Sequence, residues 1–279
     1  MLINCIHWNA NPEIIKLFGV ISLRYYSLLF VSGLLLGYTI VKRMYQKEKL
    51  PVENLEKLAT YIFIGTLVGA RLGHCFFYDP AYYFTHPLEM ILPFQGTIGK
   101  DFHFTGYRGL ASHGGAIGVL ISIIVYCKRS KTNVWFILDK VAVAIPLAGA
   151  FIRLGNLMNS EIIGHPTDVP WAFIFEKIDR LPRHPTQLYE AFAYLLIFIS
   201  IKYFYHQFHT KKQDGFIFGI FLIMLFSARI FIEFFKISQE SFENDLFLNM
   251  GQLLSIPFVL AGIVIFVKKN GENYKIRGQ

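Results

Sequence analysis

Apolar residues gather in seven long segments of the chain, separated by stretches that carry most of its charge. The segments lie at residues 17–41, 57–78, 110–127, 134–153, 188–205, 215–235 and 250–267. A helix needs about 20 apolar residues to cross a bilayer, and each segment reaches or approaches that length. The pattern predicts an all-α integral membrane protein, a bundle of seven transmembrane helices. Because the sequence shows no internal repeat and no separable soluble domain, residues 1–279 are predicted to form one transmembrane domain.

Basic residues mark one side of the predicted membrane. They lie after the first, third and fifth segments and in the tail: Lys42, Arg43, Lys47, Lys49, Lys128, Arg129, Lys131, Lys211, Lys212, Lys268, Lys269, Lys275 and Arg277. Because cytoplasmic loops carry an excess of Lys and Arg, this side and the C-terminus are predicted to be cytoplasmic. The N-terminus and the two long connections, 79–109 and 154–187, then face outward. We expect these connections to form a small periplasmic or extracellular head.

Composition agrees with a membrane protein. Hydrophobic residues make up 54% of the chain and charged residues 16%, whereas soluble domains carry about 25% charged residues. Cytoplasmic loops that face anionic lipid explain the net charge of +8, so no nucleic-acid partner is indicated. Cys5, Cys75 and Cys127 are far apart and predict neither a metal site nor a disulfide framework. The N-terminal residues do not have the pattern of a cleavable signal peptide.

The fourth segment ends in a polar group within the sequence GAFIRLGNLMNSEIIG, residues 149–164. Arg153, Asn156, Asn159 and Glu161 follow one another closely there. Lipid-facing helices rarely contain such residues without partners. If the helix continues, Arg153, Asn156 and Asn159 share one face. The group is either a solvated helix end, a polar contact between helices, or a site for an anionic headgroup at the outer leaflet.

Polar residues also occur in the second and third segments. Arg71, flanked by glycines, requires a counter-ion, a phosphate or water, so a structural ion pair and a lipid-phosphate contact are both open. His113 is followed by Gly114 and Gly115, which leave space around the imidazole. This run indicates either a helix start with small-residue helix packing or a base or headgroup ligand at the mouth of a span.

The sixth segment contains Arg229 and Glu233, four residues apart on one helical face. They form either an internal ion pair or an arrangement in which Glu233 holds Arg229 toward a phosphate. The planar fork of arginine suits the second role because it makes two hydrogen bonds to phosphate oxygens. Tyr26, near the outer end of the first segment, is predicted to line the interior.

Arg71, Arg153 and Arg229 belong to three segments but to the same outer half of the predicted bilayer. Three arginines and a histidine at one depth indicate an anion site, and a phospholipid phosphate is the anion available there. Cations stabilise a departing phosphate, and a base activates a nucleophile. No serine or cysteine lies in a recognisable nucleophile setting, so the attacking group is expected to come from a second substrate.

The sequence at 149–164 resembles the signature of the prolipoprotein diacylglyceryl transferase family of the bacterial inner membrane. Four other stretches resemble the same family: ARLGH at 70–74, the His–Gly run at 113–118, RHPTQLYE at 183–190 and ARIFIEFF at 228–235. The resemblance covers nearly the whole chain. It implies seven spans in the bacterial cell membrane, with an outward N-terminus.

The resemblance also implies a reaction, the first step of bacterial lipoprotein maturation. The diacylglyceryl group of the membrane lipid phosphatidylglycerol passes to the thiol of the lipobox cysteine that a prolipoprotein signal peptide bears. A thioether forms, glycerol-1-phosphate leaves, and no metal or organic cofactor takes part. The family's important positions fall on Tyr26, His113, Arg153, Asn156, Glu161, Gly164, Arg229 and Glu233. The chain departs from the family at Ser27, where glycine is frequent, and at Ala111 and Ser112, which replace a bulkier aromatic.

Our mechanistic hypothesis assigns a role to each polar group. Arg153 and Arg229 bind the leaving phosphate, and His113 deprotonates the peptide thiol; a carboxylate, or the arginine field alone, stays open as the activating group. Glu161 and Glu233 orient the arginines. The predicted substrate-binding residues are Tyr26, Arg71, Gly114, Gly115, Asn156, Asn159, Glu161 and Gly164. An anion or lipid transporter would use intramembrane arginines equally well, but it predicts an internal repeat and a polar path through both leaflets, which the sequence does not show.

Overall fold

The computed structural model describes residues 5–17, 21–77, 80–91, 94–95, 103–104, 111–237 and 248–271. The chain divides into two compact units, one formed by Met1–Met44 with Leu138–Gln279 and the other by Tyr45–Ile137. The larger unit contains the polar group at the end of the fourth segment. The smaller unit contains Arg71 and His113.

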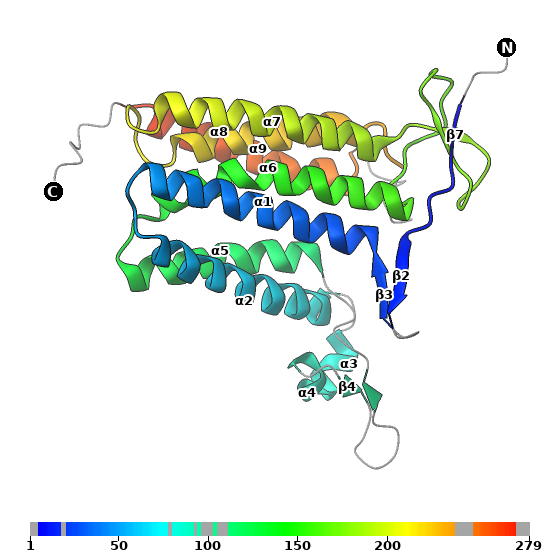
Figure 1. Cartoon of the computed structure of the whole chain (residues 1–279), viewed down its shortest axis with the longest axis horizontal. Coiled ribbons are helices and arrows are strands. Elements are labelled where there is room, and N and C mark those ends of the chain that lie inside the picture. Colours follow the sequence, from blue (N-terminus) through cyan, green and yellow to red (C-terminus); the bar gives the residue numbers. More distant parts are fainter. Residues whose placement is uncertain are drawn as a thin grey trace. The chain divides into compact units, whose positions relative to one another are not determined.

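Helices dominate both units (Figure 1). The long helices are α1 (Tyr25–Lys47), α2 (Val52–Phe77), α5 (Ser112–Ser130), α6 (Val134–Asn159), α7 (Thr186–Phe208), α8 (Phe216–Glu233) and α9 (Met250–Lys269). Within the described part of the chain, all of these except α5 are long and apolar enough to cross a membrane. The mostly helical structure with six such helices agrees with the predicted helical membrane protein, and the count of seven spans stays a prediction. Helix α5 covers the predicted third segment, but its glycines and its basic last turn, with Lys128 and Arg129, make it less apolar.

The first helix begins later than the apolar pattern predicts. Strands β2 (Glu13–Leu17) and β3 (Ile21–Arg24) pair antiparallel, and α1 follows directly from Tyr25. The hairpin carries charge on both strands. Glu13 Oε2 lies 3.7 Å from Lys16 Nζ, and Glu13 Oε1 lies 4.0 Å from Arg24 Nη2. Apolar residues between these charges made the stretch resemble the start of a span, although its backbone hydrogen bonds are made between two strands.

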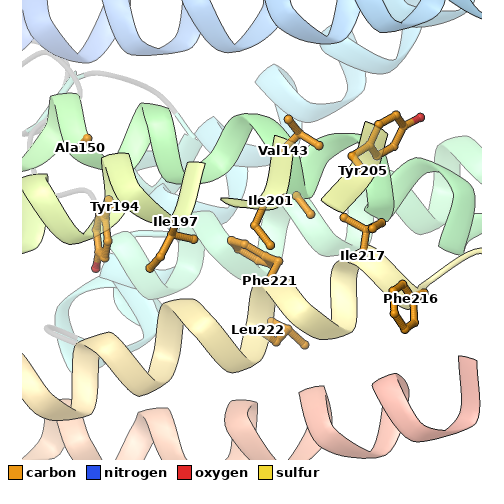
Figure 2. Packing of buried hydrophobic residues seen from close by; sticks show 11 residues of the cluster. Val143, Ala150, Tyr194, Ile197, Ile201, Tyr205, Phe216, Ile217, Phe221 and Leu222 are labelled. Carbon is orange, nitrogen blue, oxygen red and sulfur yellow. The ribbon is translucent and has the colours of Figure 1, made fainter. Parts of the chain in front are cut away.

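A buried apolar cluster holds α6, α7 and α8 of the larger unit together (Figure 2). Its labelled members are Val143, Ala150, Tyr194, Ile197, Ile201, Tyr205, Phe216, Ile217, Phe221 and Leu222. Because lipid tails are as apolar as these side chains, close van der Waals packing stabilises the contact more than water exclusion does. Helix α1 packs on α6 through Gly33, where a Cβ would lie 2.9 Å from Phe151 Cβ.

Charged residues close to the start of α6 fix the other end of these helices. Both carboxylate oxygens of Asp139 accept backbone hydrogen bonds, from Gly215 and Phe218, each 2.8 Å long. Asp139 therefore caps the N-terminus of α8, where unpaired N–H groups and the helix dipole favour a negative charge. The neighbouring Lys140 donates to the Tyr205 hydroxyl at 2.6 Å.

A small sheet anchors the connection between α6 and α7. Strand β6 (Phe173–Phe175) pairs parallel with β1 (Ile6–Trp8) and antiparallel with β7 (Pro182–Arg183). The indole of Trp8 donates to the Leu157 carbonyl at 3.0 Å, which ties the sheet to the last turn of α6. An isolated bridge joins Gly164 to Lys236, so the segment after α6 also pairs with the segment after α8.

The smaller unit is built on a close crossing of α2 and α5. A Cβ added to Gly114 would collide with the Gly69 carbonyl oxygen and lie 2.7 Å from the Gly73 Cα. Gly115 has more room, because its nearest neighbour would be Ala70 Cβ at 3.6 Å. Gly114 thus has the packing role that was one of its two predicted interpretations. The same unit contains α3 (Pro80–Thr85) and α4 (Pro87–Ile91), and β4 (Phe94–Gln95) paired antiparallel with β5 (His103–Phe104).

Candidate anion site at the end of α6

A fully buried carboxylate, Glu190 on α7, lies at the centre of the polar group. Its exposed fraction is 0%, and its neighbours Gln187 and Tyr194 share the same buried helical face. Glu190 Oε2 lies 3.0 Å from Arg153 Nε, an ion pair without hydrogen-bond geometry. Glu190 Oε1 accepts a hydrogen bond from Lys236 Nζ at 3.0 Å. The carboxylate therefore links α6, α7 and the turn after α8.

Glu233 completes this ion network from the last residue of α8. Lys236 Nζ donates to Glu233 Oε2 at 2.9 Å as well as to Glu190. Space for the Glu233 carboxylate comes from Gly251 on α9, where a Cβ would lie 2.5 Å from Glu233 Cδ. Within the described part of the chain the Glu233 carboxylate pairs with Lys236, and the hypothesis that it orients Arg229 stays a prediction. Helix α8 ends at Glu233, and the following turn brings Lys236 to the carboxylate instead.

Arg229 has no ion pair and no side-chain hydrogen bond within the part of the chain that the structure describes. It nevertheless belongs to the same group, because Arg229 and Arg153 both interact electrostatically with Tyr194. Both arginines thus lie within electrostatic range of one phenol, and that they share a substrate site stays a prediction. Among the five side chains Arg153, Arg229, Lys236, Glu190 and Glu233, three positive and two negative charges sum to +1. This sum leaves out the exposed carboxylate of Glu161, which is connected to Arg153 through Asn156.

Hydrogen bonds continue from Arg153 toward the protein surface. Arg153 Nη1 donates to Asn156 Oδ1 at 3.3 Å, and Asn156 Nδ2 donates to Glu161 Oε2 at 3.1 Å. Asn159 Nδ2 donates to the other oxygen, Glu161 Oε1, at 3.0 Å. Glu161 is exposed and accepts hydrogen bonds from the two amides, so its connection to Arg153 runs through Asn156. That Glu161 orients the arginines stays a prediction. Tyr26 packs near this group and interacts electrostatically with Arg153 and Glu161.

The turn that carries Glu161 has an unusual backbone. Ser160 and Ile162 have φ values of 55° and 57°, in the left-handed region that residues other than glycine rarely adopt. Such a conformation costs of the order of 1–3 kcal/mol per residue and persists only where its surroundings impose it. Two side chains from α7 do so here. Gln187 Nε2 donates to the Glu161 carbonyl at 2.6 Å, and Thr186 Oγ1 donates to the Ile162 carbonyl at 2.7 Å.

Gly164 lies where three backbone segments meet. A Cβ there would lie 2.6 Å from the His184 carbonyl oxygen and 2.7 Å from the Phe235 carbonyl oxygen. The Gly164 amide donates to the His184 carbonyl at 3.0 Å, and its carbonyl accepts from Arg183 Nη1 at 3.2 Å. The glycine thus allows the segments after α6 and α8 to approach, which brings Lys236 to its partners.

The remaining predicted site residues belong to the smaller unit. Arg71 is 8% exposed, and its Nε and Nη2 donate to the carbonyls of Met90 and Glu89 at 3.1 and 2.6 Å. Its guanidinium also lies over the Tyr83 ring, 5.0 Å from the centroid. Arg71 therefore holds α4 against α2. His113 lies in the first turn of α5 and is exposed.

An apolar groove on α7 and α8 does not coincide with the polar group. It encloses about 550 Å³ and is lined by residues such as Trp171, Phe192 and Phe231, with no carboxylate or arginine among its lining residues. At its rim the Tyr189 hydroxyl accepts from Trp171 Nε1 at 2.8 Å and lies 3.0 Å from His184 Nδ1. Burial, and secondarily the neighbouring His165, lower the pKa of His184. The arginines and carboxylates of the ion network thus lie outside this groove.

Comparison with known proteins decides the family. The family model described as prolipoprotein diacylglyceryl transferase matches residues 12–268. The chain belongs to the prolipoprotein diacylglyceryl transferase family. It is 52% identical to the phosphatidylglycerol–prolipoprotein diacylglyceryl transferase of Bacteroides fragilis over 262 residues, 94% of each chain. The protein of the same name from Tolumonas auensis is 48% identical over 93% of this chain and 96% of its own length. The one from Rickettsia bellii is 36% identical over 93% and 95%.

Two members of the ion network in this diacylglyceryl transferase family chain were not predicted as site residues. Glu190 ends the stretch RHPTQLYE, which carried part of the family resemblance, but neither Glu190 nor Lys236 was predicted to belong to the site. A signal existed for each. Gln187, Glu190 and Tyr194 have helical spacing, which puts three polar side chains on one face of an apolar helix. Lys236 follows Glu233 by three residues, the spacing at which side chains meet around a helix end.

Proposed function

We propose that this chain transfers the diacylglyceryl group of phosphatidylglycerol to the lipobox cysteine thiol of prolipoproteins. A thioether forms and glycerol-1-phosphate leaves, so the chain carries out the first step of lipoprotein maturation. Membership of the family and the names of its relatives support this proposal. The structural observation that carries it is the excess positive charge of Arg229 beside a charge-balanced network. One excess cation suits a phosphodiester, which carries one negative charge.

The reaction is a substitution at the glyceryl carbon that bears the phosphate. The thiol proton passes to a base, for which we propose His113, and the sulfur forms a bond to this carbon. The bond between the carbon and the phosphate oxygen breaks, and the phosphate takes the electron pair. Because a free thiol is mostly protonated at neutral pH, the base increases the amount of thiolate. Arg153 and Arg229 stabilise the negative charge that grows on the departing phosphate.

Neutral groups around the network are proposed to bind the headgroup. Tyr26, Asn156 and Asn159 supply hydroxyl and amide groups for the glycerol hydroxyls, and Glu161 keeps the amides in place. Gly164 sets the approach of the surrounding segments. We further propose that Arg71, Gly114 and Gly115 contribute to the substrate site around His113, in addition to their packing contacts.

The proposed topology has seven spans. Helix α5 is the seventh, although its hydropathy is lower than that of the other six. Basic residues in the loops after α1 and α5 support a cytoplasmic location for those loops. The N-terminus then lies outside the bacterial cell membrane, the C-terminus lies inside, and the small sheets belong to an outer head. The end of α6 that carries Arg153 then lies at the outer leaflet.

The test is a transfer assay with the purified full chain, phosphatidylglycerol vesicles and a lipobox peptide. We expect the peptide to gain the mass of one diacylglyceryl unit, and a peptide with Ser in place of Cys to gain nothing. Absence of product with the Cys peptide contradicts the proposal, and flux of anion or lipid across the vesicles without product would favour a transporter.

The role of His113 has its own prediction. In His113→Asn we expect kcat to fall by about 100- to 10,000-fold, because general base catalysis contributes that much. The transfer assay at increasing pH is the measurement, since a higher thiolate fraction should partly restore this variant. Full turnover of His113→Asn at neutral pH would exclude His113 as the base.

A further inference from the structure

The burial of Glu190 is the starting point, because the proposed reaction gives this carboxylate no direct task. It has an exposed fraction of 0%, and Lys236 is 3% exposed. Both groups are buried and neither lines the apolar groove, so neither is arranged to contact the lipid directly. Yet buried charges are costly to maintain unless they are paired, and each of these two contacts a residue that belongs to the proposed site.

Glu190 controls the orientation of Arg153. A guanidinium is planar and carries five N–H donors in a fixed fork. The carboxylate lies 3.0 Å from Nε, the atom nearest to the arginine stem, while Nη1 donates to Asn156. These two contacts restrain the guanidinium, which also interacts with Tyr194 of α7. A phosphate that binds this fork in two places depends on that orientation.

Lys236 controls the charge of the network. It contacts Glu190 at 3.0 Å and Glu233 at 2.9 Å, so one ammonium compensates two carboxylates that would otherwise repel each other. Its position depends on the bridge between Gly164 and Lys236 and on the hydrogen bond from its amide to the Glu233 carbonyl, 3.1 Å long. Lys236 thus leaves Arg229 as the cation in excess.

We propose that Glu190 and Lys236 are positioning residues of the transfer reaction: Glu190 aligns Arg153 with the leaving phosphate, and Lys236 sets the net charge that the phosphate meets. This inference rests on the proposed function. The competing interpretation is a structural contact that only holds α6, α7 and the turn after α8 together. The two interpretations predict different results for a double variant that removes both charges and keeps the net charge of the network.

The experiment compares Glu190→Gln, Lys236→Met and the double variant in the transfer assay, with kcat and KM for phosphatidylglycerol measured separately. The network has a net charge of +1 in the natural chain, +2 in Glu190→Gln, zero in Lys236→Met and +1 again in the double variant. For Glu190→Gln we expect kcat to fall about 100-fold, as for a misplaced catalytic group, while KM stays equal or decreases. For Lys236→Met we expect KM to rise.

The double variant decides between the interpretations. Its network has the same net charge as the natural chain, so we expect its thermal unfolding temperature to return toward that of the natural chain while kcat stays as low as in Glu190→Gln. Glu190→Asp, which keeps the carboxylate, should recover part of kcat. Recovery of both kcat and thermal stability in the double variant would show a structural contact and overturn the inference.

Two controls complete the design. Lys140→Met removes a buried ammonium from the opposite end of α6 and should lower the unfolding temperature without changing kcat of the folded fraction. If Glu190→Gln does not fold, the double variant and Glu190→Asp still give the comparison. Absence of transfer by the natural chain would contradict the proposed function itself, and this inference with it.

Discussion

Helix α6 carries charged side chains near both ends, and these side chains have different kinds of partner. Near its start, Asp139 accepts hydrogen bonds from two backbone amides, and Lys140 donates to a tyrosine. At its other end, Arg153 contacts the carboxylate of Glu190, while Arg229 nearby has no ion partner among the described residues. Burial of charge inside a helical bundle is therefore not sufficient to mark a site.

The two ends of α6 differ in whether their charged groups are fully compensated by partners. Asp139 completes the N-terminus of α8, so backbone groups that need an acceptor explain it fully. The network at Glu190 is built of side chains from three segments and leaves one positive charge in excess. An incompletely compensated charge within a membrane is expensive, and a ligand of opposite charge relieves that cost. The comparison predicts that substitutions at one end change activity and that substitutions at the other change stability.

The largest effect is expected at Arg153. Arg153→Gln removes a cation that stabilises the leaving phosphate and leaves Glu190 with Lys236 alone. Loss of one such stabilising group costs about 100- to 1000-fold in kcat, and we expect a loss at the upper end of that range in the transfer assay. Activity within a few-fold of the natural chain would remove Arg153 from the site.

A smaller loss is expected for Arg229→Lys, which keeps the charge and removes the planar fork. A charge-assisted hydrogen bond contributes about 1.5–3 kcal/mol, which corresponds to roughly 10- to 100-fold in kcat/KM. Arg229→Gln serves as the matched variant without charge and should be worse than Arg229→Lys. Near-normal transfer by Arg229→Lys would show that Arg229 acts as a point charge only.

At the opposite end of α6, Asp139→Ala should change stability alone. It removes both acceptors at the start of α8, and loss of a helix cap costs about 0.5–2 kcal/mol. We expect a lower thermal unfolding temperature in detergent and an unchanged kcat per folded molecule. A fall in kcat comparable with that of Arg229→Lys would erase the distinction between the two ends.

The smallest effect concerns pH and lies outside the spans. Hydrogen bonds from Arg183 lower the pKa of Asp179. The charged form is thus favoured in the folded chain, so its stabilisation is present above the ordinary aspartate pKa of about 3.9 and is lost as pH falls through the lower folded value. Asp179→Asn should unfold at a slightly lower temperature at neutral pH, with the difference vanishing in acid. A difference independent of pH would contradict this assignment.

Local sequence patterns predicted most of the fold and part of the site. The apolar segments gave the helices, because length and hydropathy are properties of one stretch at a time. That Arg153, Asn156 and Glu161 lie together was predicted for the same reason, since they follow one another around a single helix end. Strands β2 and β3 were missed, because an apolar hairpin and the start of a span have similar composition.

The partners within the site depended on contacts between distant segments. Glu190 meets Arg153 because α6 and α7 pack together, and sequence spacing gives no measure of that distance. The pairing of Glu233 with Arg229 was predicted from their four-residue spacing, but helix α8 ends at Glu233 and the turn presents Lys236. Because α8 ends at Glu233, the carboxylate of Glu233 binds Lys236 and not Arg229.

The most direct test is the affinity of the purified chain for phosphatidylglycerol in detergent. It is measured for the natural chain, for Asp139→Ala and for a variant with both Arg153→Gln and Arg229→Gln. We expect equal affinity for the first two and at least about a tenfold loss for the third, which corresponds to 1.4 kcal/mol or more. Unchanged affinity in the double arginine variant, or an equal loss in Asp139→Ala, would contradict an anion site at the end of α6.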